Sequence, residues 1–187
     1  MNKTVNVRNL TLMGMGIALN IVGAFIALNL RLPIYLDSIG TIFIACLLGP
    51  KYAVLTGVGG SLVSGMTFDI YSLYFAPVQI STGLLAGIMY NKGFLKGGKT
   101  PLGVFLFTLP TSIISAVIAA FLFGGVTSSG SSYIVQILSH FNVPMVVSVF
   151  ITQLFTDYAD KFLAVILVSL VVVALPKNFT KEVANSR

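Results

Sequence analysis

The chain has 187 residues, of which 56% are hydrophobic and only 9% are charged, and its mean hydropathy is +0.97. A soluble domain carries roughly 25% charged residues, so this composition excludes an ordinary soluble fold and predicts one membrane domain over residues 1–187. The net charge of +6 does not indicate a nucleic-acid-binding protein, because the basic residues are spread over many loops without forming a cluster.

The hydrophobic stretches predict an all-α integral membrane protein with six transmembrane helices, at about residues 10–30, 38–48, 52–66, 73–90, 102–123 and 156–175. The first is long enough to be an uncleaved helix rather than a signal peptide. The second and third are short for a hydrocarbon core of ~30 Å, so we expect them to extend, to tilt, or to form a re-entrant pair shielded by protein. Pro77 is expected to kink the fourth helix or to mark its true start.

Residues 133–155 allow two interpretations. They are apolar enough for a helix, but His140, Asn142 and Pro144 interrupt them. A seventh span here would move the basic C-terminal tail to the other side of the membrane, which the charge distribution opposes. We therefore expect an outer-side helix or a long lead-in to the last span.

Charge is segregated between the two sets of alternating loops. Arg31 and Lys161 fall on the side opposite the N-terminus, with four of the five acidic residues, Asp37, Asp69, Asp157 and Asp160. Because Lys and Arg in short loops are retained in the cytoplasm, this distribution predicts that both termini are cytoplasmic. The other basic residues all fall on the N-terminal side: Lys3, Arg8, Lys51, Lys92, Lys96, Lys99, Lys177, Lys181 and Arg187.

No catalytic, metal or cofactor site is expected. Residues 93–100 (GFLKGGKT) match the phosphate-binding loop pattern, but that loop requires a preceding strand, and a membrane helix is predicted there instead. Cys46 is a single cysteine in an apolar segment, and His140 has no nucleophile or metal ligand at suitable spacing. Lys161 next to Asp160 favours ion pairing over acid–base chemistry. Any nucleotide energy must come from another subunit.

The polar residues on the outer side predict a ligand pocket. Ionisable groups at membrane depth are costly and usually face a cavity or one another. Each has an alternative explanation, because Asp37 and Asp157 lie at predicted helix starts, where the macrodipole favours acids, and tyrosines form interfacial belts. The mixture of aromatic and hydrogen-bonding groups nevertheless suits a small polar ring. The candidate residues are Tyr35, Asp37, Asp69, Tyr71, Tyr74, Phe75, Gln79, Gln136, His140, Asn142, Asp157, Asp160 and Lys161, with Tyr158 as a further stacking residue.

The first helix carries two pairs of small residues at four-residue spacing, Gly14/Ala18 and Gly23/Ala27. Such pairs let helix backbones approach closely in lipid. Similar pairs in other helices are expected to pack internally. The repetition in the first helix fits a surface offered to a partner protein.

Several of these segments resemble the substrate-binding S components of energy-coupling factor (ECF) vitamin transporters. They are the first-helix opening Arg8…GMGIA (residues 14–18), the run LPIYLDSIGT (residues 32–41) with Gly49-Pro50, and Asp160-Lys161…Leu175-Pro176. The resemblance covers nearly the whole chain.

The resemblance implies a bacterial plasma membrane protein that binds a vitamin at its outer face. It also implies association with a membrane coupling subunit and two ATPases, followed by inward release after toppling in the bilayer. Gly14 and Ala18 correspond to the family's Ala-xxx-Ala docking motif, with Gly for the first Ala. Residues 31–37 correspond to its gating loop.

The outer acids disfavour an anionic vitamin, and the absence of Trp counts mildly against thiamine. We expect a small neutral or cationic ring, pyridoxine or a hydroxymethylpyrimidine, with pantothenate or another B vitamin as the other possibilities. Two other classes stay open: a ligand-sensing membrane subunit, and a stand-alone proton-coupled carrier that uses Asp157 and Asp160 as a relay.

Overall fold

The computed structural model describes residues 7–176 and residue 179, and within these the regular structure is entirely helical. Lys3, Lys177, Lys181 and Arg187 lie outside the described residues. The elements in chain order are α1 (Val7–Asn29), α2 (Ile39–Leu48), α3 (Pro50–Thr67), α4 (Tyr71–Tyr74), α5 (Ala76–Asn91), the 3-10 turn η1 (Gly97–Lys99), α6 (Thr100–Phe123), α7 (Ser131–His140) and α8 (Met145–Ala174).

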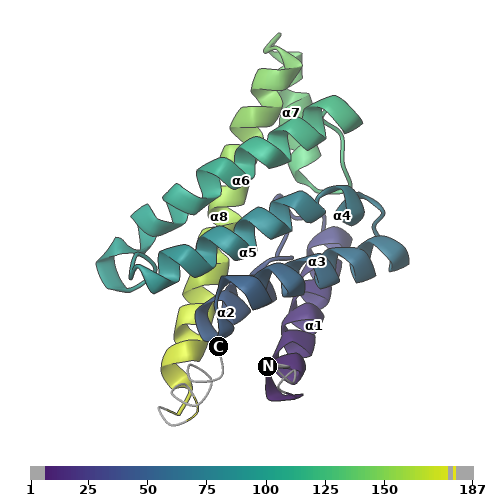
Figure 1. Cartoon of the computed structure of the whole chain (residues 1–187). Helices are drawn as coiled ribbons and strands as arrows, with labels where there is room; N and C mark the ends of the chain where they lie inside the picture. Colours follow the sequence, from purple (N-terminus) through teal and green to yellow (C-terminus); the bar gives the residue numbers. More distant parts are fainter. Residues whose placement is uncertain (1–6, 177–178, 180–187) are drawn as a thin grey trace.

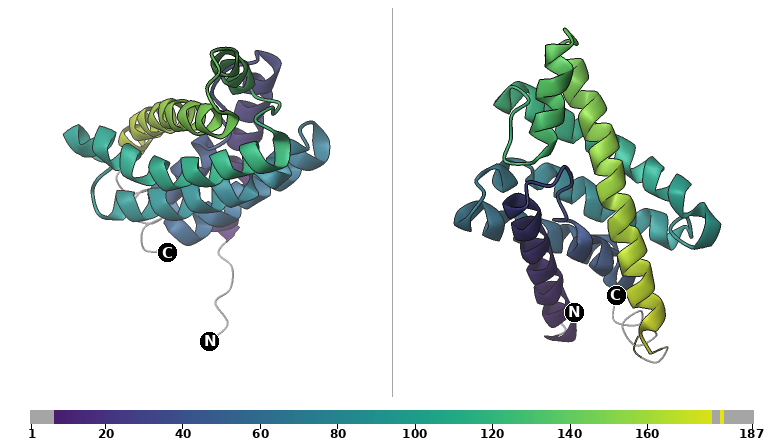
Figure 2. Two further views of the ribbon diagram at one scale, coloured as in Figure 1. Left: turned by 90° about the horizontal axis from the view of Figure 1, so that it is seen from above. Right: turned by 180° about the vertical axis from the view of Figure 1, so that it is seen from behind.

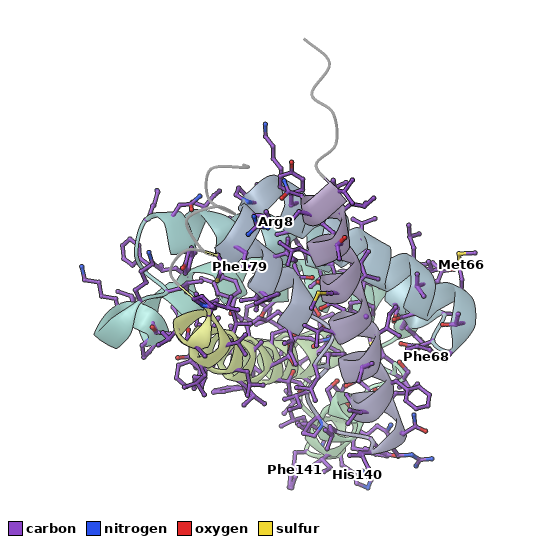
Figure 3. All side chains as sticks on the ribbon, turned by 90° about the horizontal axis from the view of Figure 1, so that it is seen from below. Arg8, Met66, Phe68, His140, Phe141 and Phe179 are labelled. Atoms are coloured by element: carbon purple, nitrogen blue, oxygen red, sulfur yellow. The ribbon has the colours of Figure 1, made fainter. Side chains whose placement is uncertain are left out.

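The helices form two layers (Figure 1). Helices α3, α5 and α6 lie side by side, and α1 and α8 cross the other face of that layer, as the rear view shows (Figure 2). Helix α2 lies between α1 and α8 and contacts both. The start of α1 and the end of α8 lie at one end of the molecule, where the Arg8 guanidinium donates to the Phe179 carbonyl at 3.3 Å and covers the Phe179 ring (Figure 3). We call this the termini end.

Helix α2 is enclosed by protein. Every residue from Gly40 to Leu48 is buried, and α1, α3, α5 and α8 all pack against it. With 10 residues, it is ~15 Å long, about half the hydrocarbon thickness. Its largely apolar sequence fills the centre of the bundle, and its one polar side chain, Thr41, is buried and hydrogen-bonded to Gln79.

Two backbone approaches need glycine. A Cβ on Gly40 would lie 1.8 Å from the Gly16 carbonyl oxygen, and one on Gly23 would lie 2.0 Å from the Leu36 carbonyl oxygen. The two small pairs of α1 therefore differ in role. Gly23 and Ala27 are buried against the α1–α2 loop, whereas Gly14 and Ala18 are exposed.

The last helix begins at Met145, not at Thr156, and has 30 residues. Residues 133–155 are thus divided between α7 and the first third of α8, with Pro144 immediately before α8. Pro144 suits that position because proline fits the beginning of a helix and cannot lie within one unstrained. Pro77 likewise lies in the first turn of α5, so it marks a true helix start, and Tyr71–Tyr74 form the separate helix α4.

Two helical stretches among the described residues, Val7–Asn29 and Gly97–Phe123, are long and apolar enough to cross a membrane. The three ionisable groups of α8, Asp157, Asp160 and Lys161, interrupt its apolar character although its length is ample. Residues 93–100 follow helix α5 rather than a strand, so the geometry of a phosphate-binding loop is absent there.

Candidate functional site

A pocket lies beside the middle of α8. It encloses about 440 Å³ of space between protein atoms, a volume that includes open solvent at its mouth. The loop between α1 and α2, the α3–α4 segment, α6, the loop after α6 and the middle of α8 all contribute to it. Its lining residues are Tyr35, Asp37, Asp69, Tyr71, Ser72, Phe75, Val78, Ser115, Thr127, Ser128, Asp157 and Lys161.

Asp160 holds the α1–α2 loop against α8. One carboxylate oxygen, Oδ1, accepts the backbone N–H groups of Tyr35 at 3.2 Å and Leu36 at 2.7 Å. The other oxygen, Oδ2, accepts the Ser38 hydroxyl at 3.2 Å and lies 3.3 Å from Lys161 Nζ. Because both oxygens are occupied by protein donors, Asp160 positions the loop and has no free lone pair aimed at the pocket.

Asp157 is different from Asp160. Its Oδ1 lies 3.7 Å from Lys161 Nζ, and its Oδ2 is buried without a hydrogen-bond partner. Both Asp157 and Lys161 lie in the interior of α8 rather than at its start. A helix-macrodipole explanation therefore fails for Asp157, since that effect is confined to the terminal turns.

A chain of buried amides supports Asp37 from below. Asn20 accepts the backbone N–H groups of Gly40 and Thr41, at 2.7 and 3.2 Å, and so caps α2 from the neighbouring helix. The Thr41 hydroxyl donates to Gln79 Oε1 at 3.0 Å, and Gln79 Nε2 donates to the Asp37 carbonyl at 3.0 Å. Gln79 thus fixes the backbone of Asp37 and lies behind the pocket lining.

Burial alters the titration of two loop residues. Burial raises the pKa of Asp37 to about 6, against the lowering effect of the nearby Lys161 charge and with a further rise from Asp160. Burial, followed by the charge of Asp157, raises the pKa of Tyr35 to about 12. The Tyr35 phenol is therefore protonated at neutral pH, and it donates to Gln153 Oε1 at 3.1 Å.

The aromatic wall of the pocket consists of Tyr71 and Phe75, supported from behind by Phe123. The Phe123 ring lies 4.7 Å from the Tyr71 ring and 6.2 Å from the Phe75 ring, measured between centroids. Tyr74 packs edge-on against the same Phe123 but is exposed and does not line the pocket. Two π faces consequently border the acidic groups.

The α1–α2 loop, which contributes Tyr35 and Asp37 to the pocket, is joined to the segment at the start of α7. Arg31 donates to the Tyr133 hydroxyl at 2.8 Å, and the Gly130 N–H donates to the Leu32 carbonyl at 3.1 Å. Gly130 is required here because a Cβ would lie 2.1 Å from the Arg31 carbonyl oxygen. These contacts join the α1–α2 loop to the start of α7.

Seven of the thirteen predicted site residues line the pocket, and Asp160 and Gln79 lie directly behind the lining. Tyr74 and three residues of the α7 region do not. Gln136, His140 and Asn142 are exposed, and His140 projects from the edge of the molecule (Figure 3). Tyr158 is also directed elsewhere, since its hydroxyl donates to the Pro101 carbonyl at 3.4 Å. The expected cover over the pocket by Gln136, His140 and Asn142 stays a prediction, and none of the three lines the pocket.

Five lining residues were missed by the sequence reasoning, namely Ser72, Val78, Ser115, Thr127 and Ser128. Most of these residues are small and carry no charge. They can therefore be identified as lining residues only from their positions in the folded structure. For Thr127 and Ser128 a signal existed: the run GGVTSSGSS is unusually polar for a loop in this chain.

The fold and the pocket define a class: a helical protein with helices apolar enough to cross a membrane and a pocket lined by carboxylates, one ammonium group and aromatic rings. The family model of the ECF transporter substrate-specific component matches residues 8–181, and the chain belongs to that family. It is therefore a membrane subunit of a transporter that binds the substrate, and not an enzyme. No curated protein and no solved structure matches the chain.

Proposed function

We propose that the chain binds a small, ring-shaped, water-soluble vitamin in this pocket and delivers it through an ATP-driven ECF complex. The observation that carries the proposal is the pocket itself, in which Asp157 and Lys161 meet the aromatic wall of Tyr71 and Phe75. The partners are a membrane coupling subunit and two ATPases, which supply the nucleotide chemistry that this chain lacks.

The proposed topology is a single membrane domain with six crossings, in a bacterial plasma membrane, with the pocket facing outward and both termini cytoplasmic. The proximity of Arg8 and Phe179 supports it, because an even number of crossings returns the chain to its starting side. Tagging accessible cysteines introduced at Lys51 and Val126 tests it. Labelling of Lys51→Cys from the outside of intact cells would contradict it.

Pyridoxine and hydroxymethylpyrimidine are the favoured ligands, because either would place a flat ring against Tyr71 and Phe75 with its polar groups at the carboxylates. Equilibrium binding of the purified protein to a panel of B vitamins, including pantothenate, tests this preference. Tight binding of pantothenate with none of pyridoxine or the pyrimidine would overturn the preference and leave the vitamin-binding role intact.

The exposed Gly14/Ala18 pair is the proposed docking surface for the coupling subunit. A Cβ at Gly14 meets no atom within 4 Å, so larger side chains fit without disturbing the fold. We expect Gly14→Leu with Ala18→Leu to abolish uptake while vitamin binding is unchanged. Ala159→Leu, at an exposed small residue of α8, is the matched control and should leave uptake intact. Loss of binding in the α1 variant would show that the pair packs the fold instead.

Two alternative functions make different predictions. A ligand-sensing subunit binds the vitamin without uptake in cells that contain the complete ECF complex. A stand-alone proton-coupled carrier moves the vitamin in liposomes containing this chain alone. Both carboxylate oxygens of Asp160 accept hydrogen bonds from the protein. This arrangement disfavours a proton relay through Asp157 and Asp160. Co-purification of two ATPases and a coupling subunit favours the ECF complex over both.

A further inference from the structure

One atom in the pocket is left without an interaction that its chemistry requires. Asp157 is 1% exposed, and its Oδ2 makes no hydrogen bond within the protein, while the neighbouring Ser112 hydroxyl donates to the Gln153 carbonyl at 3.5 Å. Buried carboxylate oxygens without donors are rare in folded proteins because they forfeit their hydration. Asp157 also lines the pocket, so its carboxylate borders the space that a ligand would occupy.

The neighbouring ammonium does not satisfy this oxygen. Lys161 Nζ lies 3.3 Å from Asp160 Oδ2, whereas its distance to Asp157 Oδ1 is 3.7 Å. Asp37 and Asp69 also line the pocket, so the site has more carboxylates than the one ammonium can balance. Arg31 does not redress the excess, because it is exposed and its guanidinium donates to Tyr133.

The excess of carboxylates over ammonium groups in the pocket favours a positively charged ligand. An anion would add to the repulsion among the carboxylates and could use only Lys161, which Asp160 already engages. Among the described residues no group of His, Cys, Asp or Glu is arranged to hold a metal ion, which argues against an inorganic cation. An organic cation meets both requirements, since its N–H satisfies Asp157 Oδ2 and its ring packs on Tyr71 and Phe75.

We propose that Asp157 is the specificity-determining residue of the pocket and that it selects a ring ligand carrying an exocyclic ammonium group, whose N–H is donated to Asp157 Oδ2. This inference rests on the proposed vitamin-binding function and narrows it. Asp160 is a positioning residue that holds the loop at Tyr35 and Leu36. Two acids three residues apart on α8 thus have separate roles.

The first test uses the unaltered protein and three pyridine probes that share one ring: pyridoxamine, pyridoxine and pyridoxic acid. They differ at one ring position, which carries an aminomethyl group (an ammonium at neutral pH), a hydroxymethyl group or a carboxylate. We expect pyridoxamine to bind about tenfold or more tightly than pyridoxine, as a charge-assisted hydrogen bond predicts, with pyridoxic acid weakest. Equal affinities, or a preference for the hydroxyl or the carboxylate, would overturn the inference while leaving vitamin binding established.

The second test assigns the selection to Asp157. Asp157→Asn should lower pyridoxamine affinity about tenfold or more and leave pyridoxine affinity within about threefold. Asp69→Asn is the matched control, because it removes the same charge from the same lining, where the Asp69 carboxylate already accepts the Ser72 hydroxyl at 3.0 Å. It should keep most of the preference. An equal loss of pyridoxamine affinity in both variants would show that the summed negative charge of the pocket selects the cation. That result would overturn the role of Asp157.

The two proposals fail in distinguishable ways. If the unaltered protein binds none of the three probes and no other vitamin of the panel, the proposed function fails and this inference fails with it. If it binds a vitamin without preferring the probe with the exocyclic ammonium group, only the inference fails. The first test needs no variant, so a folding defect in Asp157→Asn cannot obscure it.

Discussion

Two regions of the molecule bury different kinds of side chain. Toward the termini end, α2 and its neighbours form a continuous apolar core that includes Ile44, Leu47, Phe107 and Val165. Around the pocket the apolar cluster is small, and buried carboxylates, amides and hydroxyls take its place. The stability of the apolar core depends on close packing without voids. The stability of the polar region around the pocket depends on each buried polar group having a hydrogen-bond partner. Scaffold and binding site thus occupy separate parts of one helical bundle.

The largest loss of stability is expected for a substitution in the apolar core. Phe107 is fully buried in the apolar core, so Phe107→Ala should destabilise the protein by about 3–5 kcal/mol through the cavity it leaves. Thermal unfolding in detergent measures this. Ligand affinity of the fraction that stays folded should be unchanged, because Phe107 does not line the pocket. A change below about 1 kcal/mol would show that this core is loosely packed.

Asp160→Asn should destabilise the protein by about 2–4 kcal/mol, because it removes the charge that balances Lys161 and weakens the bonds to Tyr35 and Leu36. The α1–α2 loop should exchange its amide hydrogens faster. Hydrogen exchange of residues 30–38 is the measurement, with Phe107→Ala as the comparison. If that loop stays as protected as in the unaltered protein, Asp160 does not hold it.

A smaller effect concerns Asp37 and pH. Its folded pKa of about 6 lies above the unfolded value of 3.8, so the folded state binds more protons between these values. The contribution of Asp37 to stability is therefore present below about pH 4 and is lost as pH rises through 6. Asp37→Asn should remove this dependence and raise the unfolding temperature at neutral pH by roughly 2–4 °C. A pH profile unchanged by the variant would contradict this.

The smallest effects are expected at buried hydroxyls without partners. Thr108 and Thr152 each have an unbonded Oγ1, so replacing either with Val should change stability by less than about 0.5 kcal/mol or increase it. Thr156→Val is the control: its hydroxyl donates to the Thr152 carbonyl at 2.8 Å, and its loss should cost about 1 kcal/mol. Equal costs at all three positions would indicate that the unpaired hydroxyls bind water.

The sequence predicted the helical class and most of the helices, because long apolar runs are the strongest pattern in such a chain. It placed the start of the last helix wrongly, since Thr156 and Asp157 resemble a helix N-terminus and nothing local shows that α8 continues to Met145. The acids and aromatic residues of the pocket were identifiable by their cost in a membrane. The small lining residues Ser115 and Thr127 were not, because only tertiary packing brings them to the pocket.

The division of labour between Asp157 and Asp160 also lay beyond the sequence. Both residues precede Lys161 closely enough to pair with it, and helical spacing puts all three on one face. Which acid is satisfied depends on where the Tyr35 and Leu36 backbone reaches, and that is fixed by the Asn20 and Gln79 contacts beneath the loop. Such contacts join segments far apart in the chain.

In the proposed topology helix α8 crosses the bilayer, and its length then fixes the depth of the pocket. At 1.5 Å per residue its 30 residues extend ~45 Å, well beyond a hydrocarbon core of ~30 Å. About 25 Å of helix separates Asp157 from Ala174, so in the proposed orientation the pocket lies just beneath the outer headgroups. The first turns of α8, with α7, then stand above the membrane. The depth at which the ligand rests is thereby set by helical pitch, and changing the length of α8 by one turn would shift it by ~5 Å.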